Sequence, residues 1–139
     1  MIVGIGLDVV ETERWARALE SIQEQVFTPG ELAACADRAD RIQALAARFA
    51  AKEACIKALN AGIRNGGLRQ IEIVSSPGES PQIRLTGALL ARARERRVRS
   101  AHISLTHQQG FAAAVVILEG TRKRAASSRP LETVASGTW

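Results

Sequence analysis

The feature of this 139-residue sequence that most constrains its fold is an alanine-rich segment, residues 38–59, which has the composition and spacing of a long α-helix. Its large apolar residues recur every three or four positions, so they share one face of the helix. Between Phe49 and Ile56 this pattern requires one more apolar residue, but the sequence offers Lys52 and Glu53. Two charges inside the apolar face of the longest helix need a physical reason.

A third charged residue lies in an unexpected place, near the start of the chain. Residues 2–10 predict a buried strand with Gly4, Gly6 and Asp8 on one face, and we expect the two glycines to leave open space beside the carboxylate. A buried carboxylate costs several kcal/mol unless a cation or donors compensate it. Two interpretations are equally open: Asp8 caps a helix that starts near Glu11, or it binds a metal ion.

Glu53 has two interpretations as well. A solvated ion pair with Lys57, four residues on, would stabilise the helix by only ~0.3–0.5 kcal/mol and would leave the interrupted apolar face unexplained. Taken together, Glu53 and Asp8 instead form the oxygen-rich pair that is typical of magnesium sites that also bind substrate phosphates. Arg48, Lys52 and Lys57 would then supply the contacts to the phosphates.

The rest of the chain predicts short helices and strands without regular βαβ alternation. The expected fold is therefore α+β, an antiparallel sheet packed with one long and several short helices. Residues 1–119 are expected to form one domain, and residues 120–139 a flexible basic and polar tail. We expect further helices at 11–25, from Pro29 onward and at 86–97, and strands at 70–75, 82–85, 101–107 and 111–118.

Charge and composition limit the classes of partner. The net charge of +5 favours acidic partners, and the arginine-rich segment 92–99 keeps a nucleic-acid-binding module open as an alternative. That alternative leaves Asp8 and Glu53 unexplained. No stretch approaches the ~20 apolar residues of a membrane helix, and Cys35 and Cys55 lack metal-site spacing. We expect a cytoplasmic protein that binds neither membrane nor nucleic acid.

Known phosphate-binding and hydrolase signatures are absent from the sequence. There is no glycine-rich loop followed by Lys-Ser/Thr, no GxGxxG and no GxSxG. His107, at the turn of the closing hairpin, has three open interpretations: a phosphate donor, a general base, or an exposed turn residue.

Three stretches, in this order and at these separations, resemble the small bacterial holo-[acyl-carrier-protein] synthases, a 4'-phosphopantetheinyl transferase family. They are GIGLDVVETERW at 4–15, ARFAAKEACIKAL at 47–59 and HISLTHQQGFAAAVV at 102–116. The resemblance implies the α+β fold of that family over residues 1–118. It also implies a magnesium-dependent transfer of 4'-phosphopantetheine from coenzyme A to a serine of apo acyl carrier protein, which releases adenosine 3',5'-bisphosphate.

The resemblance also implies roles for individual residues. Asp8 and Glu53 would bind Mg²⁺, Lys57 would face the phosphates and the leaving group, and Glu53 is the first candidate for the general base, with His107 the second. Gln108 stands where some relatives have an aspartate, and an amide cannot act as a base. The residues expected to hold coenzyme A are Arg48, Lys52, Pro81, Thr106 and His107.

Partners follow from the same resemblance. A homotrimer with active sites between subunits is implied, and an acidic carrier protein is expected to dock on Arg14, Arg17 and Arg41. The client is expected to be a fatty-acid carrier, with polyketide or nonribosomal peptide carriers as an alternative. A noncatalytic scaffold that binds coenzyme A or a carrier is a further alternative, which the presence of Asp8, Glu53 and Lys57 disfavours.

Overall fold

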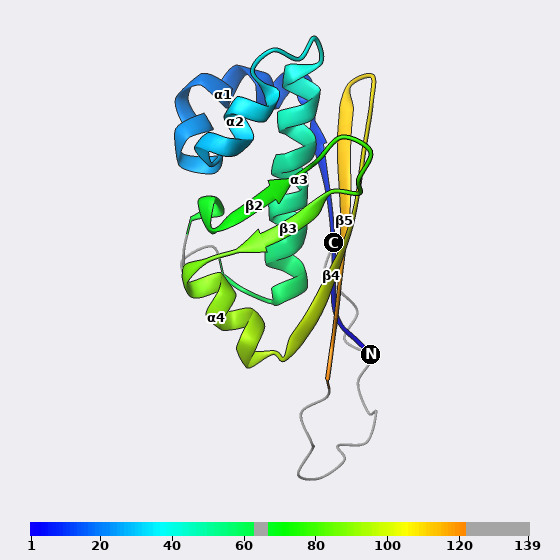
Figure 1. Cartoon of the computed structure of the whole chain (residues 1–139). Helices are drawn as coiled ribbons and strands as arrows, with labels where there is room; N and C mark the ends of the chain where they lie inside the picture. The colour runs from blue at the N-terminus through cyan, green and yellow to red at the C-terminus, as the bar shows by residue number, and fades with distance from the viewer. Residues whose placement is uncertain (63–66, 122–139) are drawn as a thin grey trace.

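The computed structural model describes residues 1–62 and 67–121 (Figure 1). The expected tail therefore lies, from residue 122 on, outside the described residues. In chain order the elements are β1 (Ile2–Glu11), α1 (Thr12–Val26), α2 (Pro29–Cys35), α3 (Arg41–Leu59), a 3-10 turn η2 (Leu68–Gln70), β2 (Ile71–Val74), β3 (Gln82–Leu85), α4 (Gly87–Glu95), β4 (Val98–Gln108) and β5 (Phe111–Gly120).

Helix α3 is the centre of the fold (Figure 1). One side of it packs on a three-stranded sheet of order β1-β5-β4, and another side packs on β2 of the two-stranded β2–β3 sheet. Helices α1 and α2 lie at one end of α3, and α4 lies at the other. All strand pairs are antiparallel, so the expected α+β class is confirmed, although the strands form two sheets.

The three-stranded sheet brings the two ends of the domain together. Strand β1 pairs with β5 with Asp8 opposite Ala114, and β4 joins β5 through a tight hairpin. Gly110 in that turn has a φ of +87°, the left-handed region that glycine adopts without strain. Asp8 thus lies within a paired strand. Glu11 is the N-cap of α1 and makes no side-chain cap bond, so the capping interpretation of Asp8 is wrong.

The two glycines of β1 do not leave the open space expected from the sequence. A Cβ atom at Gly6 would lie 1.8 Å from the carbonyl oxygen of Ala54, and one at Gly4 would lie 2.1 Å from that of Ala58. Strand β1 therefore packs directly on the backbone of α3. Because side chains alternate along a strand, the next residue on this face, Asp8, is directed at the same helix.

The other face of β1 is exposed, although the sequence predicted a buried strand. Ile5, Leu7 and Val9 are 61%, 57% and 58% exposed, and Phe111 at the start of β5 is 55% exposed. The pairing places Val115 opposite Leu7, so these side chains form a continuous apolar face on the sheet. We call Ile5, Leu7, Val9 and Phe111 the outer sheet face.

Local caps define the start of α2 and the end of α3. Helix α2 begins with a capping box in which the Thr28 side chain accepts from the Glu31 amide and the Glu31 side chain accepts from the Thr28 amide. Helix α3 ends at Asn60, which adopts the left-handed conformation with a φ of 47°, as the sequence predicted for this cap.

Two arginines of the 92–99 segment also have structural roles at this end. Arg92 donates to the carbonyl oxygens of Leu59 and Asn60 at 3.2 Å, and Arg96 donates to those of Ala58 and Val3. Cations at a helix C-terminus satisfy free carbonyls and complement the helix dipole. The arginines that the nucleic-acid alternative invokes are therefore partly used inside the fold, which weakens that alternative.

Candidate functional site

Asp8, Glu53 and Lys57 converge at the contact between β1 and α3. Lys57 Nζ lies 2.9 Å from Asp8 Oδ1 and donates to the carbonyl oxygen of Leu7, also at 2.9 Å. Glu53 and Lys57 are one helical turn apart and share a face of α3. The carboxylates come from segments 45 residues apart in sequence, so this site exists only in the folded chain.

The electrostatics of this site favour a cation. Burial raises the pKa of Glu53 above its ordinary value, the Asp8 carboxylate raises it further, and Lys57 opposes both effects. The Lys57 ammonium already contacts one of the two carboxylates. Two close carboxylates with a single lysine between them form a site to which a divalent ion would add favourable charge.

A cavity of about 520 Å³ opens beside the two carboxylates, between β1, α1 and α3. Asp8, Glu11 and Glu53 line it with carboxylates, Trp15 and Phe49 form an apolar wall, and Arg14 of α1 also lines its rim. The cavity therefore combines an anionic centre with one cationic side chain, and we call it the carboxylate cavity.

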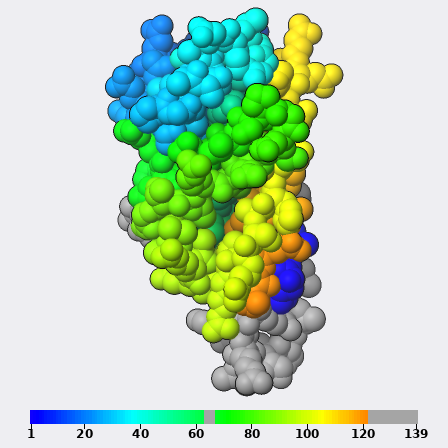
Figure 2. Space-filling view, in the orientation of Figure 1, coloured from blue at the N-terminus to red at the C-terminus, as the bar shows by residue number. Residues whose placement is uncertain are grey.

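A second cavity, of about 440 Å³, lies near the start of α3, between the β2–β3 turn and β4. It brings together Arg48, Pro81 and His107, which the sequence analysis assigned to coenzyme A, and adds Arg38. In Figure 2 the β2–β3 pair, in green, and β4, in yellow, lie next to each other on the visible face. The described residues that line it include three basic groups and no carboxylate, although Asp40 beside it pairs with Arg38; we call it the basic cavity.

The arginines of the basic cavity differ in their partners. Arg48 is buried, with Nη1 bonded to the carbonyl oxygen of Ala44 at 3.2 Å, and its Nε finds no partner among the described residues. Arg38 makes two 2.8 Å bonds to Asp40, which lower the pKa of that carboxyl. His107 Nε2 lies 3.6 Å from the same carboxylate. Arg38 and Asp40 were not predicted as site residues, since a surface arginine and aspartate two residues apart carry no distinctive signal in the sequence.

Lys52 is not at either cavity. Its side chain is 0% exposed, and its ammonium is paired with Glu31 at 2.6 Å inside the core. The expectation that Lys52 contacts coenzyme A phosphates is therefore withdrawn, because no part of this side chain is available to a ligand. The signal for its partner was present in the sequence as the capping-box pattern from Thr28 to Glu31.

The remaining predicted contacts are distributed over the surface. Thr106 is exposed on β4 opposite Ala113. It therefore lies on the side of the sheet that carries the outer sheet face, and this side is turned away from α3. Arg17 is exposed on α1, and Arg41 donates to Gln23 at 3.0 Å. Thr106 is not brought to the basic cavity within one chain.

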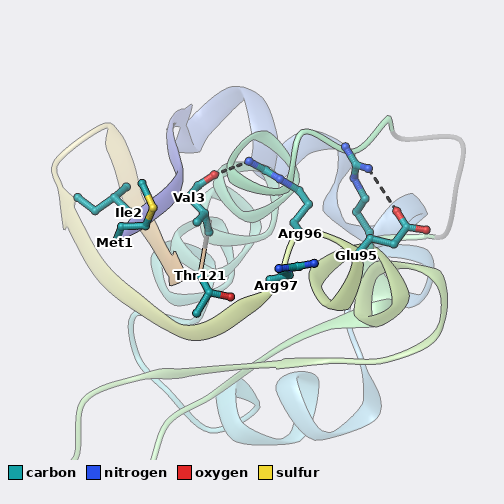
Figure 3. Close-up of a pocket in the computed structure, with 8 residues that line it drawn as sticks. Met1, Ile2, Val3, Glu95, Arg96, Arg97 and Thr121 are labelled. Carbon is teal, nitrogen blue, oxygen red and sulfur yellow. Dashed lines mark hydrogen bonds and ion pairs between the residues drawn. The ribbon is translucent and has the colours of Figure 1, made fainter. Parts of the chain in front are cut away.

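The cavity drawn in Figure 3, about 660 Å³ in volume, is remote from these groups. It lies at the opposite end of β1, where Arg96 is held by the carbonyl oxygen of Val3 and Glu95 pairs with Arg92. Among the described residues that line it, the one carboxylate is that of Glu95, which is paired with Arg92, and we assign no chemistry to this cavity.

Two negative findings apply to the described residues, 1–62 and 67–121. They contain no cluster of three or more His, Cys, Asp or Glu side chains able to hold a metal ion by themselves. They also contain no helix long and apolar enough to cross a membrane.

Comparisons with known proteins identify relatives that match most of the chain. A model of the 4'-phosphopantetheinyl transferase superfamily matches residues 4–116. Holo-[acyl-carrier-protein] synthase from Streptomyces griseus is 44% identical over 125 residues, which covers 86% of this chain and 100% of that protein. The protein of the same name from Desulfovibrio desulfuricans is 42% identical over 124 residues, covering 86% of this chain and 98% of its own.

Solved structures give the same result. The holo-[acyl-carrier-protein] synthase of Neisseria meningitidis superimposes with a TM-score of 0.75 at 31% identity, covering 86% of this chain and 99% of that one. The Helicobacter pylori enzyme, solved in complex with coenzyme A, gives 0.71 at 32% identity and covers 83% and 99%. The chain thus belongs to the 4'-phosphopantetheinyl transferase superfamily, among the holo-[acyl-carrier-protein] synthases.

Proposed function

We propose that this protein transfers 4'-phosphopantetheine from coenzyme A to a serine of apo acyl carrier protein and releases adenosine 3',5'-bisphosphate. The observation that carries the proposal is the convergence of Asp8, Glu53 and Lys57 beside the carboxylate cavity. Relatives from Helicobacter pylori and Bacillus anthracis were solved with coenzyme A, which supports that substrate here. The direct test is whether the mass of an apo carrier protein rises by one phosphopantetheinyl group.

The residues present fit a magnesium ion. Asp8 and Glu53 offer two carboxylates, and Mg²⁺ is held in proteins by one or two carboxylates while its other positions take water and substrate phosphate oxygens. Burial raises the pKa of Glu53 and repulsion from Asp8 raises it further, and a cation bound between the two carboxylates would oppose both effects. When bound there, magnesium would neutralise phosphate charge and orient the pyrophosphate of coenzyme A.

The chain's own groups account for the transfer step. The serine hydroxyl of the carrier attacks the β-phosphorus of coenzyme A, a new P–O bond forms, and the bond to the adenosine bisphosphate oxygen breaks. Glu53 accepts the serine proton, and the Lys57 ammonium stabilises the charge on the departing phosphate. His107 is the second candidate for the base, but within one chain it lies at the basic cavity, so we assign it to coenzyme A together with Arg48 and Pro81.

We also propose that the active site is completed between subunits of a homotrimer. The carboxylate cavity lies at the β1 side of the three-stranded sheet and the basic cavity at the β4 side, with β5 between them. A second copy that covers the outer sheet face would bury the exposed Ile5, Leu7 and Val9. Packing of copies there would also bring Thr106 into an interface and could unite the two cavities.

Leu7→Glu is expected to convert the trimer into monomers, because a carboxylate would be buried in an apolar interface. Analytical ultracentrifugation measures the mass, and transfer activity should fall with the loss of the trimer. Gln25→Glu, which adds the same charge on exposed α1, is the matched control and should remain trimeric. A wild-type protein with the mass of one chain would contradict the proposal.

Arg14 is proposed to bind the acidic carrier protein, with Arg17 and Arg41 contributing to the same surface. Arg14 lines the rim of the carboxylate cavity, where the serine of the carrier must enter. Arg14→Glu is expected to raise the KM for the carrier by about tenfold, because a like charge opposes docking, and to leave the KM for coenzyme A within twofold. Arg94→Glu, the same change on exposed α4, is the control and should change neither KM.

The client and the location are proposals of the same kind. A fatty-acid carrier protein is the proposed client, and assays with polyketide and nonribosomal peptide carriers distinguish it from the alternatives. We propose a cytoplasmic location; Cys35 and Cys55 are buried and unbridged, which fits a reducing compartment.

A further inference from the structure

Lys52 and Glu31 form an ion pair that is sealed inside the protein. The two side chains are each 0% exposed, and Lys52 Nζ lies 2.6 Å from Glu31 Oε2. The ammonium also donates to the carbonyl oxygens of Val26 at 2.8 Å, Leu68 at 3.0 Å and Ile71 at 2.6 Å. One buried lysine thus joins the end of α1, the start of α2, helix α3 and the start of β2.

Glu31 extends the same connection into the small sheet. Its Oε1 accepts a hydrogen bond from the Ile73 amide at 2.8 Å, and its Oε2 accepts one from the Thr28 amide at 2.9 Å. The Glu31 carboxylate therefore binds Ile73 of β2, and the Lys52 ammonium binds Ile71 of the same strand. Both charges are fully satisfied by groups of defined position.

Such a pair is poorly explained by stability alone. Removing two charges from water is costly, and apolar side chains of similar volume often replace a buried ion pair with no loss of stability. Apolar side chains cannot form hydrogen bonds, whereas the charged pair is hydrogen-bonded to specific backbone atoms of β2. The pair therefore fixes the position of β2 relative to α3.

This placement determines the shape of the basic cavity. Ile73 pairs with Ile83, and the turn that follows β2 carries Ser75, Ser80 and Pro81, which form one wall of the cavity. Arg48, on another wall, lies on α3 one turn before Lys52. A two-stranded sheet is not rigid by itself. The position of its turn therefore depends on the bonds that attach the sheet to the rest of the protein.

We propose that Lys52 and Glu31 are a positioning pair for coenzyme A binding: by fixing β2 on α3, they hold the Ser75–Pro81 side of the basic cavity at the correct distance from Arg48. Neither residue touches the substrate. The identity of the ligand rests on the proposed function, whereas the placement of β2 does not.

The test uses the double variant Glu31→Leu/Lys52→Met, which replaces the pair by apolar side chains and avoids an unpaired buried charge. Hydrogen exchange of residues 71–85, measured without ligand, and calorimetric binding of coenzyme A with magnesium are the two readouts. We expect faster exchange at residues 71–85 and at the Thr28 amide, which also loses its acceptor, and a Kd for coenzyme A raised by about 10-fold to 100-fold, as for misplacement of a binding wall. Leu118→Ala, a core change at the far end of β5, should lower the Tm without either effect.

Glu31→Gln/Lys52→Met is the second variant, used if the first double variant does not fold, and it also avoids an unpaired buried charge. It keeps an oxygen for the Ile73 amide, and we expect the same pattern at smaller size. A folded variant with wild-type exchange in residues 71–85 and wild-type affinity for coenzyme A would overturn the inference. If the wild-type protein does not bind coenzyme A, the proposed function fails instead, and the exchange measurement still tests the placement of β2.

Discussion

Replacement of Glu53 by glutamine is expected to lower kcat for phosphopantetheinyl transfer by about 10³-fold, within the range for loss of a general base. Glutamine keeps the size of the side chain but removes both the charge that would hold magnesium and the oxygen that would accept the serine proton. Steady-state transfer rates at saturating coenzyme A and carrier measure the effect.

Glu53→Gln is not expected to lower the stability of the folded protein. Burial and Asp8 raise the pKa of Glu53, so the ionised form is disfavoured in the folded protein, and at neutral pH its charge lowers stability. Without magnesium the Tm of Glu53→Gln should equal or exceed that of the wild type. Glu20→Gln on exposed α1 is the control and should retain full activity. A kcat within tenfold of wild type would remove Glu53 from the proposed chemistry.

Gly6→Val is expected to lower the free energy of unfolding by about 3 kcal/mol or more, the upper range for overpacking. A Cβ atom at this position would lie 1.8 Å from the carbonyl oxygen of Ala54 and 2.9 Å from the amide nitrogen of Ala58. Both neighbours are backbone atoms of α3, so no rotation of a side chain relieves the contact. Strand and helix must separate.

Urea unfolding measures this loss. Gly62→Ala is the control, because a Cβ there meets no atom of the described residues within 4 Å, and the change should stay within about 0.5 kcal/mol. Since the same contact directs Asp8 toward α3, the remaining folded fraction of Gly6→Val should also transfer slowly. A loss below about 1 kcal/mol would contradict the close packing of β1 on α3.

The two charges in the apolar face of α3 show how far the sequence could predict the site. The spacing identified both Lys52 and Glu53 as anomalies, and periodicity alone could not separate their roles. Lys52 is satisfied inside the core by Glu31, 21 residues earlier in the chain, whereas Glu53 borders a cavity. That distinction depends on which segments meet in three dimensions, and spacing along one helix does not contain it.

Other differences have similarly local causes. The long helix begins at Arg41, three residues later than predicted, because Asp40 has a nonhelical ψ of 31° and binds Arg38. Alternation in β1 correctly separated its two faces. It could not show that Gly4 and Gly6 pack against the backbone of α3, or that the outer sheet face is exposed in a single chain. Both features depend on which other elements pack against β1, and the sequence of the strand does not contain that information.

The central claim is tested most directly by the mass of the carrier. The purified protein is incubated with apo acyl carrier protein, coenzyme A and magnesium, with an EDTA control, and the carrier is weighed by intact-protein mass spectrometry. We predict a gain of one phosphopantetheinyl group that EDTA abolishes. An unchanged mass with fatty-acid and polyketide carriers alike would contradict the proposed transfer and favour a noncatalytic role in binding coenzyme A or a carrier.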